Sequence, residues 1–319
     1  MINHKRGDDF DGRTYLLIRY ATGDGGTRPI PNNVPFWQSP DVVIVKPDNT
    51  TGGEAVADAL NHIEVLVTNL GGIIAVNAYV DAFLCDPTTG FTPATAFPIG
   101  GGFLTVPGYG NVTISLPWTP TSFDAGHRCV MARVSLVIPP DTYQDGTIFD
   151  VINDRHIAQR NIHVVTLGGQ KKVMFPFVVP NAGKNKQDFL VVARELREPN
   201  EIAMLARTIG WGFMRIGATP LKAVNFAPIR PIDPKMPDDG AAVAAGAAGR
   251  LWFNPAKLEP TARLAPQLKL SIGANDVIPL VAVIERNEKT GPGEVHALTV
   301  QQVDGKNRTV GGFTIVVVH

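Results

Sequence analysis

The polar residues near position 150 are of the types that bind a metal cation. Asp150, Asn153 and Asp154 follow one another closely in a segment rich in turn residues. Carboxylate and amide oxygens are the ligands that Ca²⁺ prefers in proteins, so these three are the candidate metal ligands and Ca²⁺ the candidate ion. Their spacing differs from that of an EF-hand loop. The alternative is that the Asp and Asn side chains bond their own backbone and fix a turn.

No other residues have the spacing of a known catalytic or metal site. The sequence contains no G-x-S-x-G elbow, no H-E-x-x-H motif and no pair of histidines four residues apart. The glycine runs at 23–26 and 100–102 do not open a helical pattern, which a phosphate cradle requires. We therefore predict no catalytic residues, no cofactor and no enzymatic activity. An enzyme whose residues converge only in the folded chain is the alternative.

The four tryptophans lie in four separate segments, at Trp37, Trp118, Trp211 and Trp252. Indole rings stack on sugars, which makes these residues candidates for carbohydrate binding. Single tryptophans in strands more often fill cores or anchor interfaces, because they bury a large apolar area and keep one polar handle. We predict core or interface positions for them, with a sugar platform as the alternative.

The chain has two cysteines, Cys85 and Cys129, each within a strand-like run. Two cysteines make neither a disulfide framework nor a four-ligand zinc site. If the two runs face one another across a sandwich, a single disulfide forms between them. The alternative is two separate buried thiols.

Short apolar runs separated by turn residues recur through the first half of the chain. In residues 61–69, Ile63, Val65 and Val67 alternate with polar positions, which is typical of a half-buried strand. Further runs of this kind follow, with Pro/Gly-rich connections between them. We expect IHVVTL, at 162–167, to be the last strand of this set.

The second half repeats the pattern after a polar junction near residue 169. Asn200 is a fair helix N-cap, and the apolar spacing in EIAMLARTIG predicts one helix of about ten residues after it. Residues 227–250 are rich in Pro, then in Ala and Gly, and offer few large side chains for a core, so we expect a loop there.

These patterns predict an all-β protein of two tandem Ig-like β-sandwich domains, with one short helix in the second. The expected divisions are 1–36 as an N-terminal strand and extended loop, 37–168 as the first sandwich, and 169–319 as the second sandwich with the insert 227–250.

The charges exclude some classes of function. The 319 residues carry 29 Lys and Arg against 29 Asp and Glu, which argues against a general nucleic-acid binder. Residues 1–168 hold 10 basic and 16 acidic side chains, a net charge of −6, and residues 169–319 hold 19 and 13, a net charge of +6. If the two halves lie end to end, their opposite net charges favour head-to-tail contacts between copies. The alternative is scattered surface charge, whose effect salt screens beyond ~10 Å.

The N-terminal residues lack the apolar stretch and cleavage site of a secretory signal peptide, so we expect synthesis in the cytoplasm. The longest apolar runs, such as FTIVVV at 313–318, are strand-sized, and no membrane span is predicted. An extracellular place would then require delivery inside a particle, a non-standard export route or lysis.

Several segments of the first half resemble a known family. They are FWQSPDVVIV at 36–45, TNLGG at 68–72, the PW pair at 117–118, HRCVMARV at 127–134 and NDRHIAQRNI at 153–162. Together they resemble the bacterial Ig-like adhesion modules of the CARDB type, over about residues 37–167. The resemblance implies a β-sandwich, and because such modules accompany enzymes, adhesins and assembly proteins alike, it implies no single function.

The function that these observations favour is a non-enzymatic structural or accessory subunit of a larger protein assembly, such as a phage virion, a contractile-injection-type particle or its surface adhesin. We expect its partners to be other protein subunits, including copies of itself. Long Pro/Gly-rich segments suit ordering against a neighbour that buries them. The alternative is a carbohydrate-binding or cell-surface-binding module that uses Ca²⁺ at Asp150 and Asp154.

Overall fold

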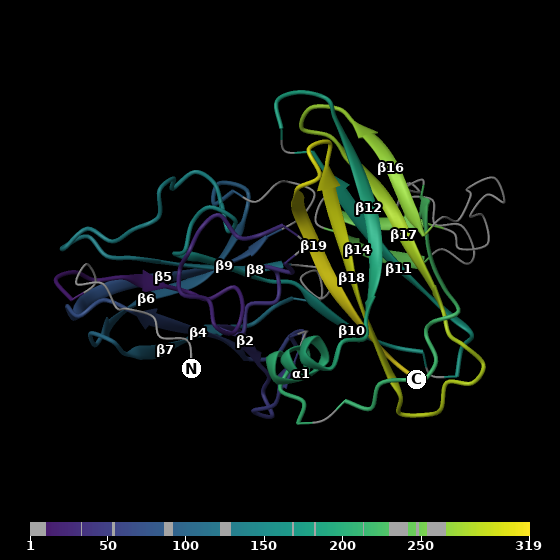
Figure 1. The fold of residues 1–319 in the computed structure, drawn as a ribbon, viewed down its shortest axis with the longest axis horizontal. Coiled ribbons are helices and arrows are strands. Elements are labelled where there is room, and N and C mark those ends of the chain that lie inside the picture. The colour runs from purple at the N-terminus through teal and green to yellow at the C-terminus, as the bar shows by residue number, and fades with distance from the viewer. Residues whose placement is uncertain are drawn as a thin grey trace.

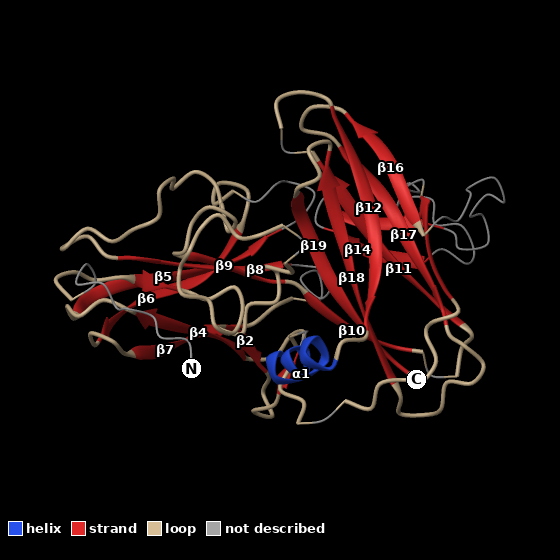
Figure 2. Ribbon diagram, in the orientation of Figure 1, coloured by secondary structure: helices blue, strands red, loops and turns tan. Residues whose placement is uncertain are grey.

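The computed structural model describes residues 11–32, 34–52, 55–85, 92–121, 129–167, 169–181, 183–212, 214–229, 242–246, 249–253 and 266–319. For residues 242–246 and 249–253 it describes the backbone alone. The described part consists of β-strands and one ten-residue helix (Figure 1, Figure 2). The predicted all-β class is therefore confirmed.

Two antiparallel sheets form the left half of the molecule in Figure 1. In the first, β4 (Asn61–Asn69) pairs with β7 (Asn111–Trp118) along one side, and with β1 (Leu16–Leu17) and β2 (Val42–Val45) along the other; β3 (Thr51–Gly52) pairs with β2. The second has the order β6 (Phe97–Val106), β5 (Ala75–Cys85), β8 (Cys129–Ser135) and β9 (Ile157–Arg160).

The core of this first sandwich lies between its two sheets. Ile63, Val65 and Val67 of β4 are fully buried, as their alternation predicts, and Val80 and Ala132 reach the same apolar cluster from the other sheet. Burying one such side chain contributes about 1.5–3 kcal/mol, so this shared cluster holds the two sheets together.

The second sandwich has a more aromatic core. Its five-stranded sheet has the order β10 (Ile162–Thr166), β19 (Thr309–Val318), β18 (Val295–Asp304), β12 (Gln187–Leu196) and β16 (Gln267–Ile272). A three-stranded sheet of β11 (Lys172–Pro180), β17 (Val277–Glu285) and β13 (Ala223–Pro228) faces it. Phe175 and Phe177 of β11 lie 5.6 and 5.0 Å from Phe313 of β19, ring centroid to ring centroid, within the shared core.

One strand belongs to a different sheet from the one we expected. IHVVTL was predicted to close the first sandwich, but β10 pairs in parallel with β19, from Ile162 opposite Thr314 to Thr166 opposite Val318. An apolar run indicates a strand but does not identify the strand it pairs with. β19 is largely buried, and it has a strand partner along each edge, β18 on one side and β10 on the other. The chain therefore crosses between the sheets at Asn161, and the division into two domains stays a prediction.

The single helix of the described part, α1 (Pro199–Thr208), forms where the sequence predicts one. It begins two residues earlier than expected, with Glu198 rather than Asn200 at the N-cap. Pro199 explains the difference, because its fixed φ and missing N–H suit the first helical position. Ile202 and Leu205 bury one face of the helix in a cluster that includes Ile162 of β10.

The insert 227–250 differs in part from the predicted loop. Its first residues end β13, and β14 (Ala242–Gly246) pairs with β15 (Gly249–Phe253) as an antiparallel hairpin. Residues 230–241 lie outside the described residues. The expectation of a loop was wrong for 242–246, because small Ala and Gly residues still form backbone ladders even where they give a core little to pack.

Candidate functional site

The three predicted calcium ligands do not share one set of partners. Asp150 accepts hydrogen bonds from the backbone N–H of Asn153, at 3.1 Å, and from its side-chain amide, at 2.8 and 3.0 Å. The carboxylate of Asp154 is buried and accepts bonds from the backbone N–H groups of Gln144 and His156. Within the described residues, no group of three or more His, Cys, Asp or Glu side chains is placed to hold a metal ion. Binding of Ca²⁺ would require Asp154 to leave these partners.

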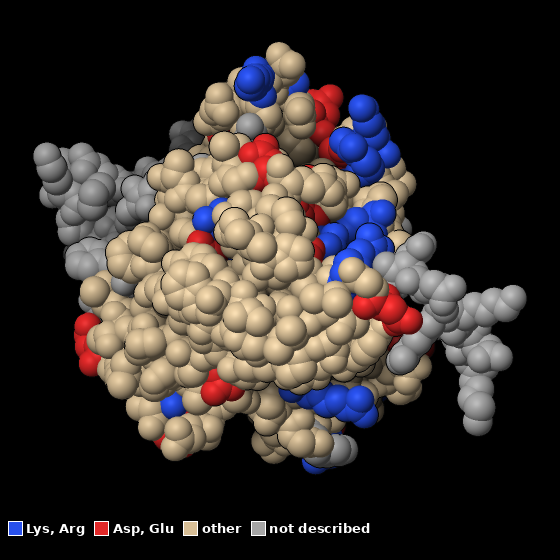
Figure 3. Space-filling view, turned by 90° about the vertical axis from the view of Figure 1, so that its left-hand side faces the viewer, with Lys and Arg blue, Asp and Glu red and all other residues tan. Residues whose placement is uncertain are grey.

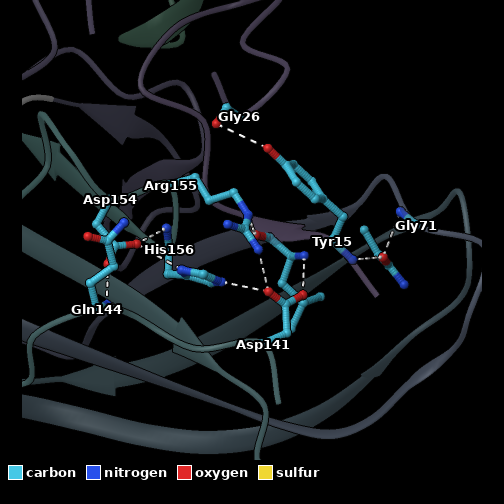
Figure 4. A network of polar contacts seen from close by, with 10 residues as sticks. Tyr15, Gly26, Gly71, Asp141, Gln144, Asp154, Arg155 and His156 are labelled. Carbon is cyan, nitrogen blue, oxygen red and sulfur yellow. Dashed lines mark hydrogen bonds and ion pairs between the residues drawn. The ribbon is translucent and has the colours of Figure 1, made fainter. Parts of the chain in front are cut away.

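Asp154 belongs instead to a buried polar network that the sequence did not reveal. His156 lies between two carboxylates, with its Nδ1 2.8 Å from Asp154 and its Nε2 2.9 Å from Asp141 (Figure 4). All three side chains are at most 6% exposed. The other oxygen of Asp141 accepts the backbone N–H of Leu16 at 2.7 Å, so the network reaches strand β1.

Arg155 extends this network to the N-terminal segment. Its guanidinium forms an ion pair with Asp141, donates from Nε to the carbonyl of Leu16 at 3.1 Å, and lies 4.1 Å from the ring centroid of Tyr15. The Tyr15 hydroxyl in turn donates to the carbonyl of Gly26 (Figure 4). We call Asp141, Asp154, Arg155 and His156 the buried clamp, because they tie β1 to the segment between β8 and β9.

The electrostatics of the buried clamp favour the charged forms of His156, Asp141 and Asp154. Burial alone would lower the pKa of His156, but its hydrogen bonds with Asp141 and Asp154 raise that pKa above its ordinary value. Burial alone would raise the pKa values of Asp141 and Asp154, yet the bonds from His156 and from backbone N–H groups hold both below their usual range. Both ring nitrogens of His156 are engaged, so the histidine has no free atom for proton transfer to a substrate. The arrangement is that of a structural clamp.

The tryptophans do not form a common platform. Trp37 is fully buried and donates from Nε1 to Thr314 of β19 at 3.1 Å, so it joins the two sandwiches. Trp118 is buried in the core of the first sandwich, and Trp211 packs half-buried beside the helix. The side chain of Trp252 lies outside the described residues. The three described indoles take core or interface positions.

The two cysteines face one another within a single sheet and not across the sandwich. Cys85 at the end of β5 lies opposite Cys129 at the start of β8, and both are buried and not joined in a disulfide. Burial, with the nearby Cys85, raises the pKa of Cys129 well above its ordinary value. The thiol form is therefore favoured, and this pair is poorly suited to nucleophilic chemistry.

A buried arginine that the sequence did not single out joins the sandwiches near Trp37. Arg160, at the end of β9, donates to the carbonyls of Val42 at 3.0 Å, Gly52 at 3.2 Å and Thr208 at 2.9 Å. Thr208 ends α1, where helical carbonyls lack intrahelical partners and a cation is favoured. Burial lowers the pKa of Arg160 to about 10, so the residue stays protonated at neutral pH.

The outer strands of the first sandwich form a second notable region, and it is uncharged. Residues 87–123 contain no Asp, Glu, Lys or Arg, and they include both β6 and β7. These two strands lie at the edges of their sheets on the same side of the sandwich. We call β6 and β7 the uncharged edge.

Exposed apolar side chains concentrate in the same half of the molecule. All the large apolar side chains that are exposed in the described part lie between residues 56 and 148, among them Phe103 at 69%, Phe97 at 55% and Ile138 at 82% exposure. Figure 3 looks onto this end of the molecule and shows a broad area without charged side chains, with acidic and basic groups mainly toward its margins. The described part of the second sandwich exposes no large apolar side chain.

Comparisons with known proteins give distant likenesses only. No family model matches the chain, and no curated protein matches it. Among solved structures, a CARDB domain from Pyrococcus furiosus in complex with di-metal ions matches with 18% identity and a TM-score of 0.23, over 33% of this chain and 79% of that domain. A family 123 glycoside hydrolase from Clostridium perfringens matches with 10% identity and a TM-score of 0.27, over 49% of this chain and 22% of the enzyme. Red sea bream transglutaminase matches with 12% identity and a TM-score of 0.23, over 87% of this chain and 31% of the enzyme. Likenesses this distant carry no argument about activity.

The described part of the chain also contains no helix that is long and apolar enough to cross a bilayer, since α1 has ten residues. Its two polar centres, the buried clamp and Arg160, have their described hydrogen bonds inside the protein. The uncharged edge, in contrast, has most of its side chains exposed or half-buried at the surface.

Proposed function

We propose that this protein is a non-enzymatic structural or accessory subunit that works through contacts with other protein subunits. The observation that carries the proposal is the location of the exposed large apolar side chains: in the described part of the chain all lie within residues 56–148, in the half that contains the uncharged edge. Soluble monomers rarely expose large contiguous apolar patches, and such patches mark interaction sites.

The buried polar groups also support a non-enzymatic role. A catalytic histidine needs one ring nitrogen free for substrate, whereas both nitrogens of His156 are bonded to carboxylates. The arrangement of Asp141, His156 and Asp154 holds strands together and leaves no reacting group exposed. It favours a stability role.

As its setting we propose a phage virion, a contractile-injection-type particle or the surface adhesin of one. The opposite net charges of the two halves favour such a setting, since opposite charges favour ordered contacts between subunits. The proposed partners are other protein subunits, including copies of this chain.

The native mass of the purified chain tests the proposal. Light scattering at about 0.01 M and about 1 M salt compares screening lengths of about 30 Å and about 3 Å. We expect an oligomer. If its mass falls at high salt, part of the contact between subunits depends on the opposite net charges of the two halves. A monomer mass of 34.2 kDa at both salt concentrations would contradict self-association and favour the alternative, a carbohydrate-binding or cell-surface-binding module. Titration with Ca²⁺ and a glycan panel would then test that alternative.

A further inference from the structure

Strand β6 leaves one row of backbone groups without a strand partner in the described part of the chain. It ends the order β6-β5-β8-β9 and pairs only with β5. Natural edge strands are protected from pairing with another chain by charges, prolines, bulges or a covering segment. β6 carries no charge, and its one proline, Pro98, is its second residue. Its pairing with β5 has register shifts between Ala82 and Phe83, beside Pro98, and between Ala75 and Ala78, near the other end of the strand. Residues 100–104 lie between these shifts and keep every backbone donor.

The middle of β6 is open to the approach of another backbone. Gly100, Gly101 and Gly102 follow one another there. A Cβ built on Gly100 would meet nothing within 4 Å, whereas one on Gly101 would meet the ring of Tyr79 from β5. The glycines therefore remove the side chains that would hold a neighbouring strand away.

An exposed aromatic pair flanks these glycines on the outer face of the sheet. Phe103 of β6 lies opposite Tyr79 of β5, with their ring centroids 5.0 Å apart. Phe103 is 69% exposed and Tyr79 is 37% exposed. Phe103 lies on the edge strand and Tyr79 on the strand inside it, so the pair stands at the margin of the sheet with exposed ring surface.

We propose that the occupant of this edge is the β6 strand of a second copy of the chain, paired antiparallel about a twofold axis near Gly102. This inference deepens the proposed function and rests on it, because it names the surface and the partner of the assembly contact. Residues that face each other in an antiparallel pair share one side of the sheet. Phe103 of each copy would thus lie beside Gly101 of the other, and the two Phe103–Tyr79 pairs would form one four-ring cluster.

Charge favours a second copy as the occupant. A twofold contact brings identical surfaces together, so any charge on β6 would meet its like. The strand has none, so no like charges meet at the contact itself, and the net charge of −6 on residues 1–168 of each copy is screened beyond ~10 Å at moderate salt. The two sheets would then continue as one eight-stranded sheet across the axis, since each copy contributes β6, β5, β8 and β9.

Two opposite substitutions at the same position test the pairing. Phe103→Lys and Phe103→Glu each place two like charges close together across the axis, and because Phe103 is exposed both variants should keep the thermal midpoint of the parent chain. We expect the parent chain to approach twice its 34.2 kDa mass with rising concentration, and each variant alone to dimerise at least tenfold more weakly. An equimolar mixture of the two variants should restore the dimer, because Lys then meets Glu. Thr113→Lys on the other uncharged strand, β7, is the matched control and should dimerise like the parent.

Other outcomes overturn the inference in distinguishable ways. If the parent chain associates but both Phe103 variants associate as tightly, the contact lies elsewhere, and the proposed function stands without this surface. If Thr113→Lys weakens association and the Phe103 variants do not, β7 is the contact strand and β6 is not. A parent chain that stays at 34.2 kDa up to about 100 μM excludes a dimer of useful affinity and contradicts self-association as well. Amide exchange on β6 provides a second readout, since pairing should slow it only at concentrations where the mass doubles.

Discussion

The outer strands of the two sandwiches present their edges in opposite ways. β16, at the edge of the five-stranded sheet, alternates buried and exposed positions and places Lys269 on the exposed side. β6, at the edge of the first sandwich, is ten residues long and has no charged residue, with three glycines and an exposed Phe103. Both strands end a sheet, and only β16 carries the charge that natural edges use against unwanted pairing.

This difference supports the proposed contact at β6. A lysine on an edge strand discourages pairing with another chain, whereas a long edge strand without charges leaves such pairing open. The buried clamp completes the contrast, since its carboxylates, histidine and arginine are paired with one another or with backbone groups inside the same sandwich. Polar groups are satisfied internally in one region and left open in the other.

The largest expected effect comes from breaking the buried clamp. Asp141→Ala removes the partner of His156, Arg155 and the Leu16 N–H at once, and removing one member of a buried ion pair costs about 3–5 kcal/mol. Urea unfolding should show a loss of that size, whereas Asp150→Asn on the neighbouring turn should cost less than about 1 kcal/mol. Equal effects from the two substitutions would show that the clamp contributes no more than a surface turn.

A smaller loss is expected at the junction. Arg160→Met keeps much of the side-chain volume but leaves the carbonyls of Val42, Gly52 and Thr208 without this donor. Unsatisfied buried groups cost about 1–3 kcal/mol each, and partial relaxation toward water leads us to expect a total of about 2–4 kcal/mol in urea unfolding. A near-neutral substitution would mean that these carbonyls find other donors.

The pH dependence of stability follows from the same clamp. The raised pKa of His156 means that its contribution is complete below about pH 6.5 and is lost as pH rises through the raised value. The lowered pKa values of Asp141 and Asp154 mean that their contribution is present above about pH 4 and is lost as pH falls through the lowered values. The stability that His156→Gln removes should therefore be greatest between about pH 4 and about pH 6.5, and each shift of one pKa unit corresponds to about 1.4 kcal/mol. A difference between parent and variant that stays constant from pH 3 to about pH 9 would contradict this account.

The smallest expected effect concerns Lys269 on the edge strand β16. Lys269→Thr makes β16 neutral, like β6, and should change the free energy of unfolding by about 0.5 kcal/mol or less. If lysine protects this edge, the variant should associate slightly more than the parent at high concentration, by less than the tenfold change expected at Phe103. Sedimentation velocity measures both. A larger gain in association than the Phe103 variants lose would show that β16, and not β6, is the edge closer to pairing.

Part of this molecule could be derived from local pattern. The alternation in residues 61–69 gave β4 with its buried face, and the apolar spacing after residue 200 gave α1, because side-chain periodicity reflects which face is buried. The start of α1 and the hairpin at 242–253 could not be predicted from local pattern, since Pro199 and short Ala/Gly runs are compatible with several local conformations.

The candidate sites show the limit of local pattern more clearly. Asp150, Asn153 and Asp154 are neighbours in sequence, yet Asp154 turns to His156 and shares with it a network that includes Asp141 and Leu16. Arg160 gives no signal in the sequence, because its three acceptors lie between 48 and 118 residues away. Contacts over such separations depend on how strands are placed and not on their local composition.

The sequence by itself determined the strand-rich class, the helix α1 and the neutrality of residues 87–123, because these depend on periodicity and residue type within a short window. Only the tertiary structure decided that β10 joins the second sandwich, that Asp154 is part of a clamp, and that neutral β6 lies at an edge. The physical reason is that hydrogen bonding across a sheet and burial of charge depend on which segments become neighbours. That choice is made by the whole core, since no single strand carries the information that selects its partner.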